Sequence, residues 1–333
     1  MRFTDVPQDG YQRVIHVEDD VTGLDAYIAL HSTKLGPAIG GIRLYAYEDR
    51  QQQLTDALRL SKGMTFKNAA AGLDHGGAKT TINLNKIKDR NAAFQILGKA
   101  VNLLDGAYIC AGDVGTTTAD LYKVNDGTSY VAGITLDSSK PTALGVYTSI
   151  EALLDFNGKR VNQTSFTIEG MGKVGKKLAD CLMAQGGDVR AYDPYDAVFK
   201  EYDNSKFTIT QLSAAHVLDD DSDMYVPCAL GATLNMRSLN TMTQRFVCGS
   251  ANNQFATPND IAIAHNLGIQ YVPDFIANCG GVVAVAYDFK RQNANTFLTT
   301  TLRQRIIDML AEAKHEDIPA QIIAEQIANR RLN

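Results

Sequence analysis

The chain has 333 residues, of which 45% are hydrophobic, and a formal net charge of −5 at pH 7. This length and apolar content exceed what one ordinary hydrophobic core uses, and they indicate two domains. The charge argues against a nucleic-acid partner held through phosphate contacts, and no apolar run is long enough to span a bilayer.

The N-terminus lacks the apolar core of a signal peptide. The five cysteines are widely scattered and never form a CxxC pair, and the six histidines show no metal-ligand spacing. Such thiols are typical of a reducing compartment. We therefore expect a cytoplasmic protein without disulfides, without a metal ion and without a membrane or nucleic-acid partner.

The first half of the chain predicts strands followed by amphipathic helices. Residues 12–31 are typical of a β-hairpin with its turn at 19–23. The segment 36–41, GPAIGG, is predicted to be a glycine-rich bend where backbone approaches a ligand. Helices are expected over 51–61 and again after Asp89, which would be the N-cap of the second helix. A short strand is expected over 108–110.

Two lysines, Lys67 and Lys79, lie twelve positions apart in the segment GMTFKNAAAGLDHGGAK. The residues between them are mostly small, apolar or glycine, and only Asp74 carries a fixed charge. A desolvated ammonium beside a second cation loses its proton more easily and can serve as a neutral-amine base. The alternative is that both are ordinary surface lysines on a loop.

The second half of the chain begins at a predicted boundary, Lys140-Pro141, followed by a helix over 143–156. Short apolar runs at 165–169, 188–193, 224–227, 246–249 and 269–272 alternate with helical segments such as 173–185. This alternation predicts a parallel sheet covered by helices on both faces. The tail, residues 296–322, is predicted to be helical throughout.

Three glycines, Gly170, Gly172 and Gly175, stand between a predicted strand and a predicted helix in the G-x-G-x-x-G arrangement. The first permits a tight turn, the second lets a pyrophosphate approach the backbone, and the third lets helix and strand pack closely. Asp193 ends the next strand, where an acid binds the adenine ribose hydroxyls and repels a 2′-phosphate. The pattern predicts NAD rather than NADP; the alternative is a strand–turn–helix that binds nothing.

With these features, the chain resembles the amino-acid dehydrogenases of the glutamate/leucine/phenylalanine/valine family over nearly its whole length. The resemblance lies in six blocks: LGPAIGGIR (35–43), GMTFKNAAAGLDHGGAK (63–79), YICAGDVGTTTADL (108–121), PCALGATLN (227–235), GSANNQ (249–254) and PDFIANCGGVVAV (273–285). It implies an α/β fold with an N-terminal substrate domain containing a mixed sheet, a C-terminal Rossmann-type doubly wound domain, and a cleft between them. We place the substrate-binding and oligomerisation domain at residues 1–139 and the NAD-binding domain at 140–300, with helices of 300–333 packing back on the first.

The resemblance also implies chemical roles for residues in these blocks. Lys79 would be the catalytic base, and Asp113 would hold the substrate amino group and relay protons. Lys67 would bind the substrate carboxylate, helped by the backbone of Gly40 and Gly41.

Further residues would contact the cofactor or the substrate side chain. Thr142 would meet the nicotinamide amide, and Asn252 would lie where cofactor and substrate come together. The other predicted cofactor residues are Gly170, Met171, Gly172, Lys173, Val174, Gly175, Asp193, Cys228 and Ala229. The positions matching the leucine enzyme's side-chain pocket are Ile39, Met64, Ala111, Val282 and Val285.

The predicted activity is reversible, NAD-dependent oxidative deamination of an L-amino acid, branched-chain and aliphatic, to the 2-oxo acid and ammonia. The alternatives are an aromatic (phenylalanine or tryptophan) dehydrogenase, a shikimate-dehydrogenase-like alcohol oxidoreductase and a non-catalytic NAD-binding regulator. The sequence departs from the family pattern at Asp74, His75, Ala78, Gly112 and Cys279, and these departures are expected to affect specificity and assembly more than chemistry. A homo-oligomer is expected by analogy.

Overall fold

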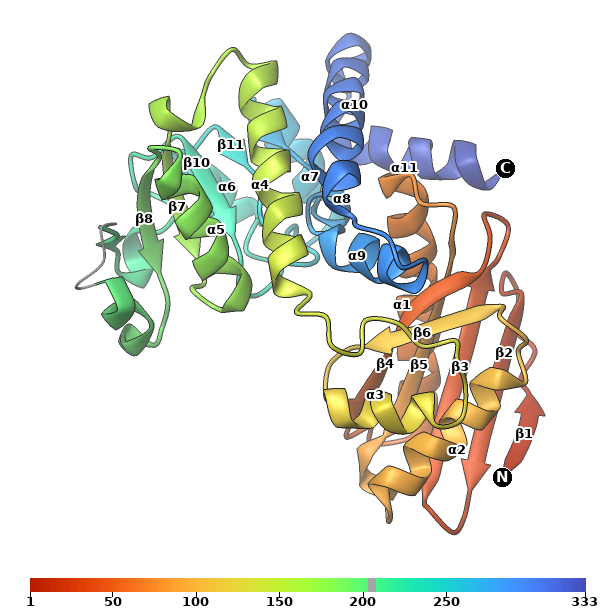
Figure 1. The fold of residues 1–333 in the computed structure, drawn as a ribbon. Helices are drawn as coiled ribbons and strands as arrows, with labels where there is room; N and C mark the ends of the chain where they lie inside the picture. Colours follow the sequence, from red (N-terminus) through yellow and green to blue (C-terminus); the bar gives the residue numbers. More distant parts are fainter. Residues whose placement is uncertain (203–207) are drawn as a thin grey trace. The chain divides into compact units, whose positions relative to one another are not determined.

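The computed structural model describes residues 1–202 and 208–333, which form two compact units (Figure 1). The first unit comprises Met1–Asp137, Val282–Asn293 and Ile327–Asn333, and the second comprises Ser138–Gly281 and Ala294–Gln326. Each unit has its own sheet. The functional assignment of residues 1–139 and 140–300 to substrate and cofactor stays a prediction.

A six-stranded mixed sheet with the order β1-β2-β3-β5-β4-β6 forms the centre of the first unit. Its strands are β1 (Arg2–Asp5), β2 (Arg13–Asp19), β3 (Leu24–Ser32), β4 (Ala38–Tyr45), β5 (Gly76–Asn83) and β6 (Tyr108–Gly112). The predicted hairpin is the antiparallel pair β2 and β3, in which Ile15 lies opposite Ile28. β4 runs parallel to both of its neighbours, β5 and β6.

The predicted bend over 36–41 is wrong for most of its length, because β4 begins at Ala38. The glycines of this strand are there for close packing. A Cβ on Gly40 would lie 1.6 Å from the carbonyl oxygen of Ala78, and a Cβ on Gly41 would lie 2.7 Å from the Cβ of Asp113. The segment therefore continues as a strand to Tyr45 and presents alternate residues to opposite faces.

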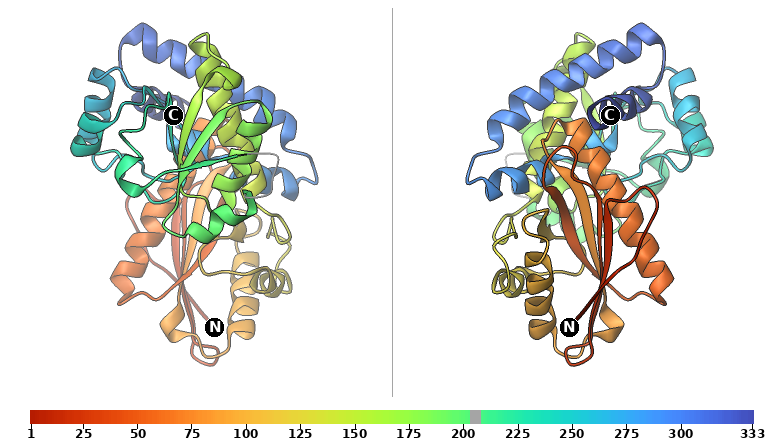
Figure 2. Two further views of the ribbon diagram at one scale, coloured as in Figure 1. Left: turned by 90° about the vertical axis from the view of Figure 1, so that its left-hand side faces the viewer. Right: turned by 90° about the vertical axis from the view of Figure 1, so that its right-hand side faces the viewer.

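Helices cover both faces of this sheet, as the two views of Figure 2 show. They are α1 (Arg50–Ala71) on one face and α2 (Arg90–Asn102) with α3 (Thr118–Asn125) on the other. Leu54 and Ala57 of α1 pack against β2 and β3, whereas Phe94 and Leu97 of α2 enter the core of the opposite face. α1 runs ten residues past the predicted 51–61 and therefore carries Lys67.

The second unit contains a fully parallel sheet with the order β12-β11-β10-β7-β8-β9. Its strands are β7 (Ser165–Glu169), β8 (Asp188–Tyr192), β9 (Thr210–Gln211), β10 (Met224–Pro227), β11 (Phe246–Val247) and β12 (Gln270–Tyr271). The chain starts in the middle at β7, adds β8 and β9 on one side, and then adds β10 to β12 on the other. This is the doubly wound order of dinucleotide-binding domains, and it confirms the predicted fold class.

The helices that accompany this sheet are α4 (Ser139–Phe156), α5 (Lys173–Ala184), α6 (Met236–Thr241), α7 (Pro258–Asn266), α8 (Asp274–Ala277) and α10 (Leu302–Glu316). α4 begins four residues before the predicted start at 143 and includes Pro141. A proline is tolerated there because the first-turn N–H groups have no partner within the helix. Two further helices, α9 (Gly280–Phe289) and α11 (Ala320–Leu332), contribute residues to both units.

The prediction of one continuous helix over 296–322 is wrong. A π-helical turn (Phe297–Thr301) leads into α10, which ends at Glu316; its C-cap, Asp317, has the left-handed conformation, with φ of 54°. Pro319 follows, and α11 begins at Ala320. A left-handed residue followed by a proline ends a helix, because neither can continue its hydrogen-bond ladder.

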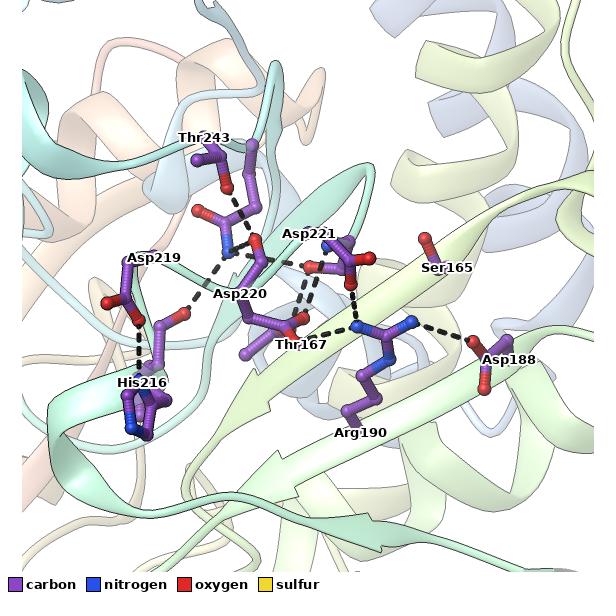
Figure 3. A network of polar contacts seen from close by, with 12 residues as sticks. Ser165, Thr167, Asp188, Arg190, His216, Asp219, Asp220, Asp221 and Thr243 are labelled. Atoms are coloured by element: carbon purple, nitrogen blue, oxygen red, sulfur yellow. Dashed lines mark hydrogen bonds and ion pairs between the residues drawn. The ribbon is translucent and has the colours of Figure 1, made fainter.

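A polar network holds the loop that leads into β10 (Figure 3). Arg190 of β8 donates to Asp220 at 2.7 Å and also pairs with Asp221 and Asp188. The hydroxyl of Thr167, on β7, donates to Asp220 at 2.6 Å. These contacts tie the loop to the sheet. Throughout the described ranges, every helix is too short or too polar to cross a membrane.

Candidate active site

The period of two along β5 places the side chain of Lys79 on the face of the sheet that α1 covers. Ala29, its partner in β3, packs against Leu54 and Ala57 of α1. α1 lies so close to β5 that a Cβ on Gly77 would be 2.1 Å from a backbone nitrogen of the helix. Lys79 is consequently only 5% exposed, although it lies in a polar cluster.

The ammonium of Lys79 forms a buried ion pair with the carboxylate of Asp113. Lys79 Nζ lies 2.8 Å from Asp113 Oδ2. Asp113 follows β6, and its backbone is held by Thr116, whose hydroxyl accepts from the Asp113 N–H at 2.9 Å and donates to the Asp113 carbonyl at 2.7 Å. Gly41 leaves room for the pair, since a Cβ there would lie 3.1 Å from Lys79 Nζ. The structure thus brings the predicted base and the predicted acid together.

A second cation, Arg43, also contacts Asp113. Its Nε donates to Asp113 Oδ2 at 2.9 Å, and its Nη1 donates to Asp56 Oδ2 on α1 at 3.1 Å. The Tyr47 hydroxyl donates to the same Asp56 oxygen at 2.8 Å. Sequence reasoning missed this cluster because it treated 36–41 as a bend. The signal was present, since a strand puts Arg43 on the same face as Gly41.

The electrostatics of the cluster suit an amine that must lose a proton. Burial lowers the pKa of Lys79 and Arg43 adds to that effect, while Asp113 opposes it. Burial would raise the pKa of Asp113, but Lys79 and Arg43 together hold it below the ordinary value. In the structure Arg43 is a cation that lowers the pKa of Lys79. The predicted effect of Lys67 on the same amine stays a prediction.

The remaining predicted substrate residues of the first unit lie on the same face or near it. Ile39 and Ala111 are buried, and Ala111 lies beside Gly41 in the register of β4 and β6. Lys67 is half-buried on α1, one helical turn after Met64. The carbonyl of Gly40 accepts a hydrogen bond from the Tyr108 hydroxyl at 3.2 Å.

Val282 and Val285 are half-buried on α9. A Cβ on Gly133 would lie 3.1 Å from Val285 Cγ2, and the Gly133 N–H donates to Asp288 of α9 at 2.9 Å. Val131, two residues before Gly133, bridges to Cys110 of β6. These contacts bring the second half of α9 to the strand that carries Ala111.

The residues that depart from the family pattern lie in different parts of the structure. Ala78 packs into the core on the sheet face opposite to Lys79, and Cys279 is buried. Gly112 ends β6 and is exposed. His75 is buried, with Nδ1 3.0 Å from the Pro37 carbonyl oxygen, and its Nε2 has no hydrogen-bond partner among the described residues.

In the second unit, the three glycines of the fingerprint meet the physical requirements of a phosphate-binding turn. Gly170 has a φ of +101°, which favours glycine, and a Cβ on Gly175 would lie 2.0 Å from the Gly170 carbonyl oxygen. A Cβ on Gly172 would meet nothing within 4 Å. The backbone there is open to a ligand, and Lys173 and Val174 begin α5 at the same turn, so its N-terminal N–H groups are available to phosphate.

Asp193 lies directly behind this turn, just after β8. Its Oδ2 accepts a hydrogen bond from the N–H of Met171 at 2.8 Å, and its Oδ1 accepts from the N–H of Tyr195 at 3.0 Å. The side chain of Met171 is fully buried. The carboxylate of Asp193 therefore lies against the glycine turn, and its predicted contact with the adenine ribose stays a prediction.

The other predicted cofactor residues lie on loops that follow neighbouring strands. Cys228 and Ala229 follow β10, the neighbour of β7, and a Cβ on Gly170 would lie 2.7 Å from the Ala229 Cβ. Asn252 follows β11, and its Oδ1 accepts from Asn278 at 2.8 Å. Thr142, on α4, donates to the Ser138 carbonyl at 2.7 Å. β7 and β10 meet where the strand order reverses, which is the usual ligand site of such sheets.

One group of side chains has the spacing of a possible metal site among the residues that the structure describes: His16, Glu18 and Asp25. His16 Nε2 lies 2.7 Å from Asp25 Oδ1. Arg50 pairs with Glu18 and, at 3.4 Å, with Asp25. The arginine already supplies the cation that these carboxylates need.

The chain is similar to known proteins over nearly its whole length. A family model for the Glu/Leu/Phe/Val dehydrogenase dimerisation domain matches residues 11–130, and one for Glutamate/Leucine/Phenylalanine/Valine dehydrogenase matches residues 188–325. The leucine dehydrogenase of Bacillus cereus is 35% identical, with 97% of this chain and 91% of that protein aligned. The valine dehydrogenase of Streptomyces coelicolor is 37% identical, with 98% and 93% aligned.

A solved structure has a similar fold. The crystal structure of L-tryptophan dehydrogenase from Nostoc punctiforme matches with a TM-score of 0.87 and 28% identity, over 97% of this chain and 96% of that one. The chain belongs to the glutamate/leucine/phenylalanine/valine dehydrogenase family.

Proposed function

We propose that the protein catalyses the reversible, NAD-dependent oxidative deamination of a branched-chain aliphatic L-amino acid to its 2-oxo acid and ammonia. Family membership supports the reaction class, an oxidoreductase that uses a nicotinamide cofactor and acts on an amine. The observation that carries the proposal is the buried pair of Lys79 and Asp113, 2.8 Å apart. An alcohol oxidoreductase of the shikimate-dehydrogenase type does not account for this family membership.

Lys79 and Asp113 divide the acid–base work. Asp113, kept ionised by two cations, binds the ammonium of the substrate. After oxidation to the imine, Lys79 in its neutral form takes a proton from water, which attacks the imine carbon. The resulting carbinolamine loses ammonia, and its nitrogen is protonated through Asp113. Lys67, a half-buried cation on α1, binds the substrate carboxylate.

The glycine turn of the second unit supports the choice of cofactor. NAD, when bound, supplies the nicotinamide that accepts a hydride from the substrate α-carbon. Gly172 and the N-terminus of α5 bind the pyrophosphate, and Asp193 binds the adenine ribose. A carboxylate at Asp193 repels a 2′-phosphate, which favours NAD over NADP.

The substrate side chain is proposed to contact Ile39, Met64, Ala111, Val282 and Val285. All five are uncharged, so they suit an aliphatic chain and would not bind the second carboxylate of glutamate. The relatives at 35% and 37% identity are named for leucine and valine. The tryptophan enzyme matches in fold at lower identity, so an aromatic substrate is the second candidate.

We also propose that the protein forms a homo-oligomer in the cytoplasm. The family model that matches residues 11–130 describes a dimerisation domain, which supports self-association. The five cysteines are widely scattered in the sequence and never form a CxxC pair, which supports a reducing compartment.

A plate assay tests the activity. The protein is mixed with NADH, ammonium and each of a panel of 2-oxo acids, aliphatic, aromatic and acidic, and NADH consumption is followed. We expect fast consumption with the 2-oxo acids of leucine, valine and isoleucine, only when ammonium is present. Faster consumption with aromatic 2-oxo acids would replace the substrate class, and consumption without ammonium would contradict the reaction.

A further inference from the structure

Arg43 is the residue of the cluster to which neither the family resemblance nor the proposed reaction gives a role. Its guanidinium lies between two carboxylates, with Nε 2.9 Å from Asp113 Oδ2 and Nη1 3.1 Å from Asp56 Oδ2. Asp56 is itself fixed by Tyr47 at 2.8 Å and by Arg59 at 2.8 Å. A chain of charge-assisted contacts therefore runs from α1 through β4 to the carboxylate that meets Lys79.

The geometry at Asp113 is asymmetric. Arg43 Nε and Lys79 Nζ both contact Oδ2, at 2.9 and 2.8 Å. Among the described residues, none donates a hydrogen bond to Asp113 Oδ1. Two donors on one oxygen fix the rotation of the carboxylate and leave the other oxygen available to the substrate ammonium.

We propose that Arg43 is a positioning residue for the deamination reaction. Held by Asp56, it fixes the orientation and negative charge of Asp113, and its own positive charge favours the neutral form of Lys79. The expected effect of Arg43 on catalysis rests on the proposed function. Its effect on the titration of Lys79 can be measured without turnover.

Other charged or titratable side chains lie near the cluster. On the strands around β4 and β5 they are Tyr27 and His31 of β3, Tyr45 at the end of β4, Tyr47 just after β4, and Asp113 just after β6. On α1 they are Arg50, Asp56, Arg59, Lys62 and Lys67. His31 contacts Thr65 and Arg50 pairs with Glu18 and Asp25, away from Asp113. Among the residues that the structure describes, Asp113 forms ion pairs with Arg43 and Lys79.

The contacts predict opposite effects for the two partners of Arg43. Arg43→Gln removes a cation near Lys79, so the ammonium is stabilised and its titration midpoint rises. Asp56→Asn removes an anion whose charge favours the protonated amine, so the midpoint falls. Arg43→Lys keeps the charge and should restore most of the wild-type value.

The experiment is a carbon-13 NMR titration of the full-length protein with lysines enriched at the ε-carbon. The Lys79 signal is assigned by its absence in Lys79→Met. The matched control is Arg59→Gln, which also contacts Asp56 but lies on the exposed side at 60% side-chain exposure. We expect less than a third of the Arg43→Gln shift in this control. The ascending limb of kcat against pH should move in the same directions.

Two results would overturn the proposal: an unchanged Lys79 midpoint in Arg43→Gln, or equal shifts in Arg43→Gln and Arg59→Gln. If Arg43→Gln does not fold, a midpoint in Asp56→Asn that fails to fall is sufficient to reject it. A purely structural role for Arg43 would lower thermal stability without these signed shifts. Absence of turnover with every amino acid would reject the proposed function while leaving the titration result intact.

Discussion

Replacing Lys79 by methionine tests the role of the buried amine while preserving most of the side-chain volume. Without the base, proton removal from water falls to solvent, and a positioned base is generally worth about 10²–10⁴ in rate. This corresponds to about 3–5 kcal/mol of activation free energy. We therefore expect kcat for amino-acid oxidation to fall by at least about a hundredfold.

The fold should survive this change. Removing one partner of a buried ion pair costs about 3–5 kcal/mol when the other charge is left alone, but Asp113 keeps Arg43 at 2.9 Å. Lys79→Met should therefore lose less unfolding free energy than that range, and NADH binding to the second unit should be unchanged. Lys123→Met, at an exposed pair with Asp126, is the matched control and should keep full activity. A variant that retained more than a tenth of wild-type kcat would refute the assignment of Lys79 as the base.

Three further predictions follow from the same geometry. Gly41→Ala should reduce activity at least tenfold, because the new Cβ would lie 2.7 Å from the Cβ of Asp113. Gly63→Ala, whose new Cβ would meet nothing within 4 Å, should instead stabilise the protein by about 0.5–1 kcal/mol in denaturant unfolding, because alanine favours the helix α1 more than glycine does. Gly172→Ala should weaken NADH binding with little loss of stability, whereas Gly175→Ala should destabilise the fold by about 1–3 kcal/mol; equal thermal stability of the two would count against the packing argument. Because the pKa of Lys79 is lowered from 10.5 in the folded state, unfolding takes up a proton there at pH values between the lowered pKa and 10.5, and stability contributed by this site rises with pH. The unfolding free energy of Lys79→Met relative to wild type should accordingly decline as pH rises toward 10.5; a difference independent of pH would mean that this pKa is not lowered.

Much of the fold could be predicted because its signals are local. The alternation of apolar runs and helices in the second half predicts a parallel sheet, and Asp89 marks the start of α2, where its carboxylate accepts a hydrogen bond from the N–H of Ala92. The errors came from residues whose conformation depends on distant packing. Gly40 and Gly41 are typical of a bend in isolation, yet β5 and β6 require them as close-packed strand residues.

The candidate site was only partly predictable for the same reason. Lys79 and Asp113 could be named from their sequence blocks, and the structure places them in contact. The involvement of Arg43 and Asp56 depends on the period of β4 and on how α1 lies over the sheet. Neither residue stands out in the sequence, because arginine and aspartate are common on exposed strands and helices. Only the three-dimensional arrangement shows that both are connected to the carboxylate of Asp113.

Following the nitrogen atom shows whether this chain interconverts an amino acid and a 2-oxo acid. The protein is incubated with NADH, the 2-oxo acid of leucine and ammonium carrying a heavy nitrogen isotope, and the products are analysed by chiral chromatography and mass spectrometry. We predict labelled L-leucine in equal amount to the NADH consumed. Formation of the 2-hydroxy acid, or NADH consumption without label in an amino acid, would contradict the account.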